Sequence, residues 1–169
     1  YVLDPTFGMG TYYMELVGIS PPSWFTDPQW ALPAIIGIDW WHTVGFTFVI
    51  MLAGLQTVPE QLYEAARIDG AGAWQRMWHV TIPMMSPTIF FASVITFIGA
   101  FQIFDPIQII TPNGGPEEST LSIVMYLYQQ GFQAFQAGYA SAVALVVFVI
   151  MALVTAIQFW LSRKWVHDQ

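Results

Sequence analysis

Two side chains in the first apolar stretch of this chain could do chemistry together. Asp39 and His42 are three residues apart, a spacing that places them on one face of a helix. A carboxylate beside an imidazole can move a proton or contribute to a metal site. The remaining histidines, His79 and His167, lie elsewhere in the chain, so no third ligand completes a coordination shell. We therefore predict no catalytic residue and no metal site, and we interpret Asp39 as an interface or entrance residue.

A second polar group lies near the end of the next apolar stretch. Gln102, Asp105 and Gln108 follow one another at three-residue intervals, which places them on one face of a helix. Pro106 removes an internal hydrogen bond and is expected to kink or end that helix. Polar residues inside a membrane mark solute pathways or contacts with neighbouring spans. The three residues are therefore a candidate solute path, or a contact surface for a partner span.

Several kinds of chemistry are excluded by what the chain lacks. It has no cysteine, which rules out disulfides, thiolate zinc sites, cysteine nucleophiles and iron–sulfur clusters. It has no glycine-rich loop ending in Lys-Ser or Lys-Thr, so this chain is not expected to hydrolyse ATP. Four Lys and Arg against eleven Asp and Glu give a net charge of -7, which argues against a nucleic-acid partner.

The composition indicates a membrane protein. Of the 169 residues, 56% are hydrophobic and only 9% are charged, whereas a soluble domain carries about 25% charged residues. Three stretches, at about residues 32–55, 88–110 and 139–161, are apolar and reach the roughly 20 residues that a membrane-spanning helix needs. We predict an all-α, polytopic membrane helical bundle with three transmembrane helices, in contact with the lipid bilayer.

The basic residues predict the orientation of these spans, because Lys and Arg near span ends stay on the cytoplasmic side. All of them fall between the first two spans or after the third: Arg67, Arg76, Arg163 and Lys164. The other side has no Lys or Arg, and its charged residues are acidic: Asp4, Glu15, Asp27, Glu117 and Glu118. We expect residues 1–30 to be an external loop or amphipathic segment, and residues 31–169 to hold the membrane domain with a cytoplasmic loop at about 56–83.

Two further features of the outer side are read from the residue types. The first residue is Tyr1 rather than Met, and we interpret the chain as a fragment of a longer protein. Tryptophans cluster around the start of the first span, where an aromatic belt at the lipid headgroups is expected; a sugar-stacking role for one of them is the alternative. These residues are Trp24, Trp30, Trp40 and Trp41.

The cytoplasmic loop has the sequence of a short capped helix. Thr57 and Glu60 have capping-box spacing, and Pro59 suits a first turn, where no amide hydrogen is needed. The helix should end at about Asp69, with Gly70 as a left-handed cap. A second helix is expected over about residues 73–80, ending before Pro83. One face of the first helix carries mainly small side chains, which permit close approach of another surface: Leu62, Ala65, Ala66 and Asp69.

The spacing across this loop resembles a family signature. Glu64-Ala65-Ala66 is followed by three residues, Gly70, nine residues, Val80, one residue, and Ile82-Pro83. This is similar to the EAA loop of ATP-binding-cassette (ABC) importer permeases, the binding-protein-dependent transport system inner-membrane components, which have Ile and Leu at the positions of Val80 and Ile82. In that family the loop docks on a separate ATPase subunit. The resemblance implies these ATPase-coupling residues: Glu64, Ala65, Ala66, Arg67, Asp69 and Gly70.

Other segments resemble the carbohydrate-uptake branch of that family, in particular the first permease of maltose-type and glycerol-3-phosphate-type importers. They are Ile68-Asp69-Gly70-Ala71, the run from Phe101 to Asp105, and the run from Thr111 to Pro116. The resemblance implies the C-terminal half of a six-span permease with a MetI-like core, in the inner (cytoplasmic) membrane. It implies three protein partners: an ATPase subunit, a second permease subunit and an extracytoplasmic solute-binding protein.

The expected function is therefore ATP-dependent import of a sugar or sugar-like solute. The resemblance implies that this chain holds no cofactor, because the partner subunit binds ATP, and that the chain is not itself an enzyme. Two rival interpretations remain. One is a structural membrane subunit without transport activity, and the other is an intramembrane enzyme that uses Asp39 and His42.

Overall fold

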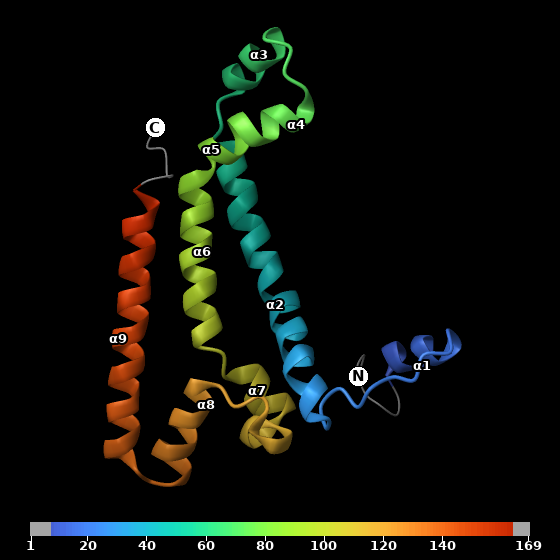
Figure 1. The fold of residues 1–169 in the computed structure, drawn as a ribbon, viewed down its shortest axis with the longest axis vertical. Helices are drawn as coiled ribbons and strands as arrows, with labels where there is room; N and C mark the ends of the chain where they lie inside the picture. Colours follow the sequence, from blue (N-terminus) through green and yellow to red (C-terminus); the bar gives the residue numbers. More distant parts are fainter. Residues whose placement is uncertain (1–7, 164–169) are drawn as a thin grey trace. The chain divides into compact units, whose positions relative to one another are not determined.

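The computed structural model describes residues 8–163, and every regular element in that range is helical (Figure 1). Three stretches are long and apolar enough to cross a membrane: Pro28–Gln56 (α2), Ser86–Ile110 (α6 and α7) and Ala137–Ser162 (α9). They confirm the all-α membrane fold and overlap the three predicted spans. The predictions that concern Tyr1, Asp4, Lys164 and His167 lie outside the described residues.

Contacts within the chain group it into two units. Residues 1–42 and 101–145 form the first, and residues 43–100 and 146–169 form the second. The first unit contains α1 (Met9–Leu16), α7 (Asp105–Ile110), 3-10 turns at Pro112–Gly114 and Pro116–Glu118, and α8 (Ile123–Tyr128) followed by a π-helical segment, Gln129–Gln133. Helix α1 lies in the region predicted as an external loop or amphipathic segment, and α8 lies in a region predicted as an external loop.

The core of the first unit joins α2, α7 and α8. Ile35, Ile107 and Met125 are buried together in it, and partly buried neighbours such as Leu121 pack against them. Hydroxyl groups hold the intervening turns, since the Oγ1 atoms of Thr111 and Thr120 lie 2.9 Å apart and both side chains are buried. The outer connection between spans is therefore a packed structure.

The second span is interrupted close to Pro106, where a kink or an end of the helix was expected. The helix α6 ends at Phe101 and α7 begins at Asp105. Pro106 lies in the first turn of α7, where its missing amide hydrogen costs nothing. The hydroxyl of Ser122 donates to the carbonyl of Ile103 at 2.7 Å, which satisfies a backbone group that the break leaves without a helical partner.

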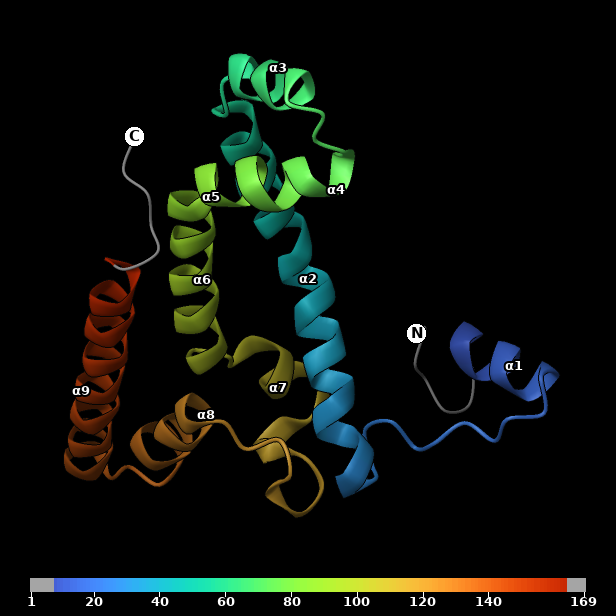
Figure 2. The same cartoon turned by 45° about the horizontal axis from the view of Figure 1, so that its top comes forward.

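The second unit contains the shorter helices that follow α2 along the chain. They are α3 (Glu60–Ile68), α4 (Ala73–Arg76), a π-helical segment at Met77–Thr81, and α5 (Ile82–Met84), which leads into α6 (Ser86–Phe101). In Figures 1 and 2, α4 lies crosswise at the ends of α2 and α6. A Cβ added to Gly54 would lie 2.5 Å from the side chain of Thr88, so α2 and α6 are closely packed there.

Two local predictions for this loop are wrong. Thr57 does not cap α3, because its hydroxyl donates to the carbonyl of Gly54 at 2.7 Å, and Pro59 occupies the N-cap. The second helix does not end before Pro83, because the π-helical segment Met77–Thr81 comes before α5, which contains the proline. The wider π turn relieves the clash that a proline ring makes with the preceding turn of an α-helix.

Candidate functional site

The candidate site is the α3–α4 knob, defined here as residues 60–84, and its first helix ends as the sequence predicts. Gly70 has φ +76°, the left-handed conformation of a helix cap. Its amide donates to the carbonyl of Arg67 at 3.0 Å, and the amide of Ala71 donates to that of Ala66 at 2.9 Å. These two bonds make a Schellman motif. An added Cβ at Gly70 would meet nothing within 4 Å, so only the backbone conformation favours glycine.

The surface of α3 is open along its whole length. None of its residues is buried, and Glu64, Ala65 and Arg67 are exposed, as are Asp69 and Gly70 just beyond the helix. A helix whose small residues packed against its own spans would be buried on one side. The exposure of α3 therefore argues against such packing.

The two alanines of the motif differ in environment. Ala65 is exposed, whereas Ala66 is half-buried. Ala66 lies on the side of Tyr63, whose hydroxyl is 3.0 Å from the hydroxyl of Thr81 in the π-helical segment. That contact fixes which side of α3 faces the rest of the knob. It leaves Glu64 and Ala65 facing outwards, so of the two alanines Ala65 is the better placed to meet another protein.

The knob also exposes large apolar side chains that were not predicted as functional residues. Ile68 is 86% exposed and Trp74 is 72% exposed. Trp78 packs edge-on against Trp74, with ring centroids 5.9 Å apart, and is itself exposed. The four-residue spacing of the two tryptophans was the available signal. Exposed apolar groups gathered on a small element are typical of an interaction surface.

A groove of about 450 Å³ lies between α3 and α4. Its lining includes Leu55, Tyr63, Arg67, Arg76, Met77 and Thr81. Arg67, one of the residues implicated in ATPase coupling, thus lines the groove as well as being exposed. The Nε atom of Arg76 is enclosed and has no hydrogen-bond partner within the described part of the chain.

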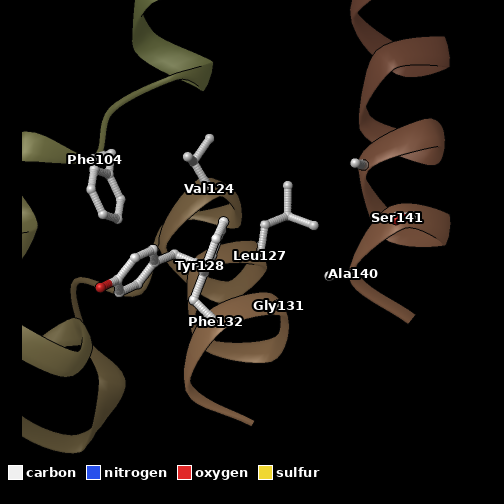
Figure 3. A pocket seen from close by; sticks show the side chains of 9 residues that line it. Phe104, Val124, Leu127, Tyr128, Gly131, Phe132, Ala140 and Ser141 are labelled. Carbon is white, nitrogen blue, oxygen red and sulfur yellow. The ribbon is translucent and has the colours of Figure 1, made fainter. Parts of the chain in front are cut away.

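A second cavity, of about 360 Å³, lies in the first unit between the α8 region and α9 (Figure 3). Its walls are mainly apolar, and Leu127 points towards the helix that carries Ser141. Tyr128 stacks on Phe132 with centroids 5.5 Å apart and lies 5.1 Å from Phe104. This aromatic cluster was not predicted, although the four-residue spacing of Tyr128 and Phe132 places them on one face of a helix.

The candidate solute path lies outside both cavities. Gln102 falls in the break between α6 and α7, so it does not share one continuous helix with Asp105 and Gln108 as the spacing had suggested. Gln102 and Asp105 are exposed, and Gln108 is half-buried. The amide oxygen of Gln108 is enclosed and has no hydrogen-bond donor among the residues described.

The other ionisable groups on the outer side, as far as residues 8–163 show them, include Asp39, His42 and a pair of hydrogen-bonded tyrosines. Asp39 is half-buried and His42 is exposed on α2. Over residues 8–163 there is no group of three or more His, Cys, Asp or Glu side chains able to hold a metal ion. The hydroxyl of Tyr139 lies 3.2 Å from that of Tyr126, and this hydrogen bond raises the pKa of Tyr126 above its usual value. Neither tyrosine contacts a candidate nucleophile in the interactions described here.

Residues 5–167 match the family described as binding-protein-dependent transport system inner membrane components. The chain belongs to this family. It is 43% identical over 145 residues to the probable ABC transporter permease protein YesP of Bacillus subtilis, covering 85% of this chain and 47% of YesP. It is 38% identical over 157 residues to the sulfoquinovosyl glycerol transport system permease protein SmoG of Agrobacterium fabrum, covering 93% of this chain and 51% of SmoG.

A solved structure has the same fold. A chain of a bacterial ABC transporter involved in the import of the acidic polysaccharide alginate superposes with a TM-score of 0.77 at 25% identity. The superposition covers 96% of this chain and 57% of the other. The chain thus spans about half the length of YesP and of SmoG. Family membership and three helices long enough to span a membrane place the chain among multi-pass inner-membrane components of binding-protein-dependent transport systems.

Proposed function

We propose that this chain is the C-terminal part of a permease subunit that imports a sugar or sugar-like solute at the expense of ATP hydrolysed by a partner. The observation that carries the proposal is helix α3 of the α3–α4 knob. This helix has no buried residue, ends in a glycine cap and bears the family's EAA pattern. The relatives support the solute class, since one is named for sulfoquinovosyl glycerol and another takes part in alginate import.

In this mechanism the ATPase subunit grips the outward side of α3. Glu64 and Asp69 offer carboxylates to the partner, Ala65 allows close approach, and Gly70 holds the turn. The knob connects at its start to α2 and, through the π-helical segment and α5, to α6. Movement of the knob therefore pulls on two spans at once, which suits alternating access driven by closure of the ATPase.

The same proposal assigns the other partners and the solute path. A second permease subunit completes the membrane pathway, and an extracytoplasmic solute-binding protein docks on the outer loops. Gln102 and Asp105, whose side chains are exposed, and the neighbouring Gln108 would offer polar groups to the solute hydroxyls. We infer that the chain binds no cofactor and is not an enzyme, because the partner subunit holds the ATP.

Introduced cysteines test the coupling surface, since this chain has none of its own. In the full-length permease with its partners, Ala65→Cys should react with a membrane-impermeant maleimide only from the cytoplasmic side. Binding of the ATPase subunit should protect it. The matched control is Gln136→Cys, an exposed position in the outer connection, which should react only from outside whether or not the ATPase is bound.

Three results would contradict the proposal. Equal labelling of Ala65→Cys with and without the ATPase would remove the docking surface. Labelling of Ala65→Cys from the outside would reverse the orientation. Finally, a reconstituted complex that hydrolyses ATP but moves no labelled sugar in proteoliposomes would favour the structural-subunit alternative.

A further inference from the structure

The groove between α3 and α4 gathers most of the positive charge in the described chain. Over residues 8–163 the cations are Arg67, Arg76 and Arg163, and two of these three line the groove. The whole sequence has a net charge of -7, so the positive charge of the groove is opposite in sign to the net charge of the chain. Two guanidinium groups in one groove repel each other unless an anion lies between them.

The arginines also have unused hydrogen-bonding capacity. The Nε atom of Arg76 is enclosed and finds no partner in residues 8–163, although a buried donor without an acceptor is costly. The hydroxyls of Tyr63 and Thr81, also in the lining, lie 3.0 Å apart. The hydroxyl of Thr81 also donates to the carbonyl of Arg76 at 3.4 Å, so the guanidinium groups are the donors in the groove that suit a phosphate oxygen. The groove is therefore built for an anion, and phosphate is the chemistry that fits it.

The surroundings of the groove indicate where the phosphate comes from. Leu55, in the last turn of the membrane-length helix α2, lines one side, and Met77 of the π-helical segment lines another. Trp74 and Trp78 are exposed on the same helical run. Tryptophan rings favour the headgroup level of a bilayer, and α4 lies crosswise at the span ends (Figure 2). Cations beside interfacial tryptophans are typical of a surface that meets anionic lipid.

We propose that the α3–α4 groove binds the phosphate headgroup of an anionic glycerophospholipid from the cytoplasmic leaflet, with Arg67 and Arg76 as its ligands. The lipid would occupy the junction between the membrane spans and the knob. This inference depends on the cytoplasmic placement of the knob, but not on which solute is carried.

Lipid retention by the purified full-length complex is the test. Phosphatidylglycerol and phosphatidylcholine that remain bound after detergent extraction would be counted by native mass spectrometry. Wild type should retain phosphatidylglycerol, and Arg67→Gln with Arg76→Gln should weaken that retention about tenfold or more. The matched control, Arg163→Gln, removes the remaining described cation outside the groove and should change nothing. Arg76→Lys keeps the positive charge but loses the planar guanidinium group with its paired donors, so an intermediate loss of phosphatidylglycerol retention is expected.

Tryptophan quenching in the otherwise unmodified groove keeps the test independent of the folding of the arginine variants. In nanodiscs, brominated phosphatidylglycerol should quench wild-type fluorescence more than brominated phosphatidylcholine, and Trp74→Phe with Trp78→Phe should remove the difference. Unchanged phosphatidylglycerol retention in the double arginine variant would overturn the proposal, as would equal quenching by both lipids. Release of the bound lipid by inorganic phosphate alone would show a free-anion site instead. Loss of the ATPase with lipid retained would show that the groove holds a partner carboxylate.

Discussion

The outer connection at residues 102–136 and the α3–α4 knob are built from similar parts and are held in different ways. Each contains a short α-helix followed by a five-residue π-helical segment, and each has glycine with positive φ, Gly114 and Gly115 in the outer connection and Gly70 in the knob. In the outer connection, Ile107 and Met125 are buried with Ile35 of α2. In the knob, α3 has no buried residue at all.

The difference separates structure held by the chain's own core from structure presented to something else. The outer connection derives its conformation from apolar packing and from the buried contact between Thr111 and Thr120. The knob is held by its Schellman cap, by the contact between Tyr63 and Thr81, and by local hydrogen bonds. No residue of the knob is buried, and its exposed Trp74 and Trp78 contact each other at the surface, which suits a docking element.

The largest expected effect contrasts one side chain from each region. Met125→Ala removes a side chain with no exposed surface and should lower the free energy of unfolding by about 2 to 5 kcal/mol. Ile68→Ala, at a position 86% exposed, should change it by less than about 0.5 kcal/mol. Denaturant unfolding of the purified full-length subunit in detergent measures both. A loss at Ile68 as large as that at Met125 would mean that the knob is packed against its own chain.

The helix cap gives the next effect. Gly70→Val forces a β-branched residue into φ +76°, a strain of about 1 to 3 kcal/mol, and should abolish uptake while membrane insertion continues. Gly70→Asn should recover part of the uptake, because asparagine tolerates this conformation. Gly72→Ala is the matched control, since Gly72 has φ -67°. Uptake at the wild-type rate by Gly70→Val would disprove the role of the cap.

Bulk on the outward side of α3 tests the docking surface. Ala65→Trp inserts volume where close approach is expected, and overpacking of about 1 to 3 kcal/mol weakens ATPase binding about tenfold or more. Because Ala65 is exposed, expression and unfolding should stay near normal. Ala66→Trp should both weaken docking and destabilise the knob, since Ala66 is half-buried. Co-purified ATPase and stimulated ATP hydrolysis are the measurements, with the exposed outer position Ala137→Trp as control. A fully coupled complex with Ala65→Trp would place the docking surface elsewhere.

Sequence patterns that depend on one element were enough to predict much of this molecule. The three spans follow from long apolar runs, and the cap at Gly70 follows from a glycine placed after an amphipathic turn. These signals are local, because no distant residue has to be known to interpret them. The family resemblance through the EAA spacing depended on the same stretch and was confirmed by the family match.

The predictions that were wrong depended on competition between groups. The hydroxyl of Thr57 could cap α3 or hydrogen-bond to the end of α2, and it donates to the carbonyl of Gly54 in α2. Pro83 could end a helix or be accommodated by a wider turn, and the π-helical segment accommodated it. The outer helix α8 depends on packing of Met125 against Ile35, which are distant in sequence. Periodicity carries no information about such partners.

The smallest expected effect concerns catalysis in the outer region. A catalytic residue there would contradict the contrast between an outer region with a structural role and a knob with a functional role. Asp39 and His42 are the pair that an intramembrane enzyme would use. Asp39→Asn combined with His42→Ala keeps the shape of the first side chain and removes the exposed second one. Uptake should fall several-fold at most.

The reason is that neither residue belongs to a group able to hold a metal in residues 8–163, and proton transfer alone requires a substrate within hydrogen-bond reach. A modest loss would reflect altered contacts of Asp39 at an entrance or a subunit interface. The measurement is sugar uptake together with recovery of the assembled complex, so that failed assembly is separated from failed transport. Complete loss of uptake in a normally assembled complex would support a proton relay in the outer region. Transport would then depend on functional residues in both the outer region and the knob.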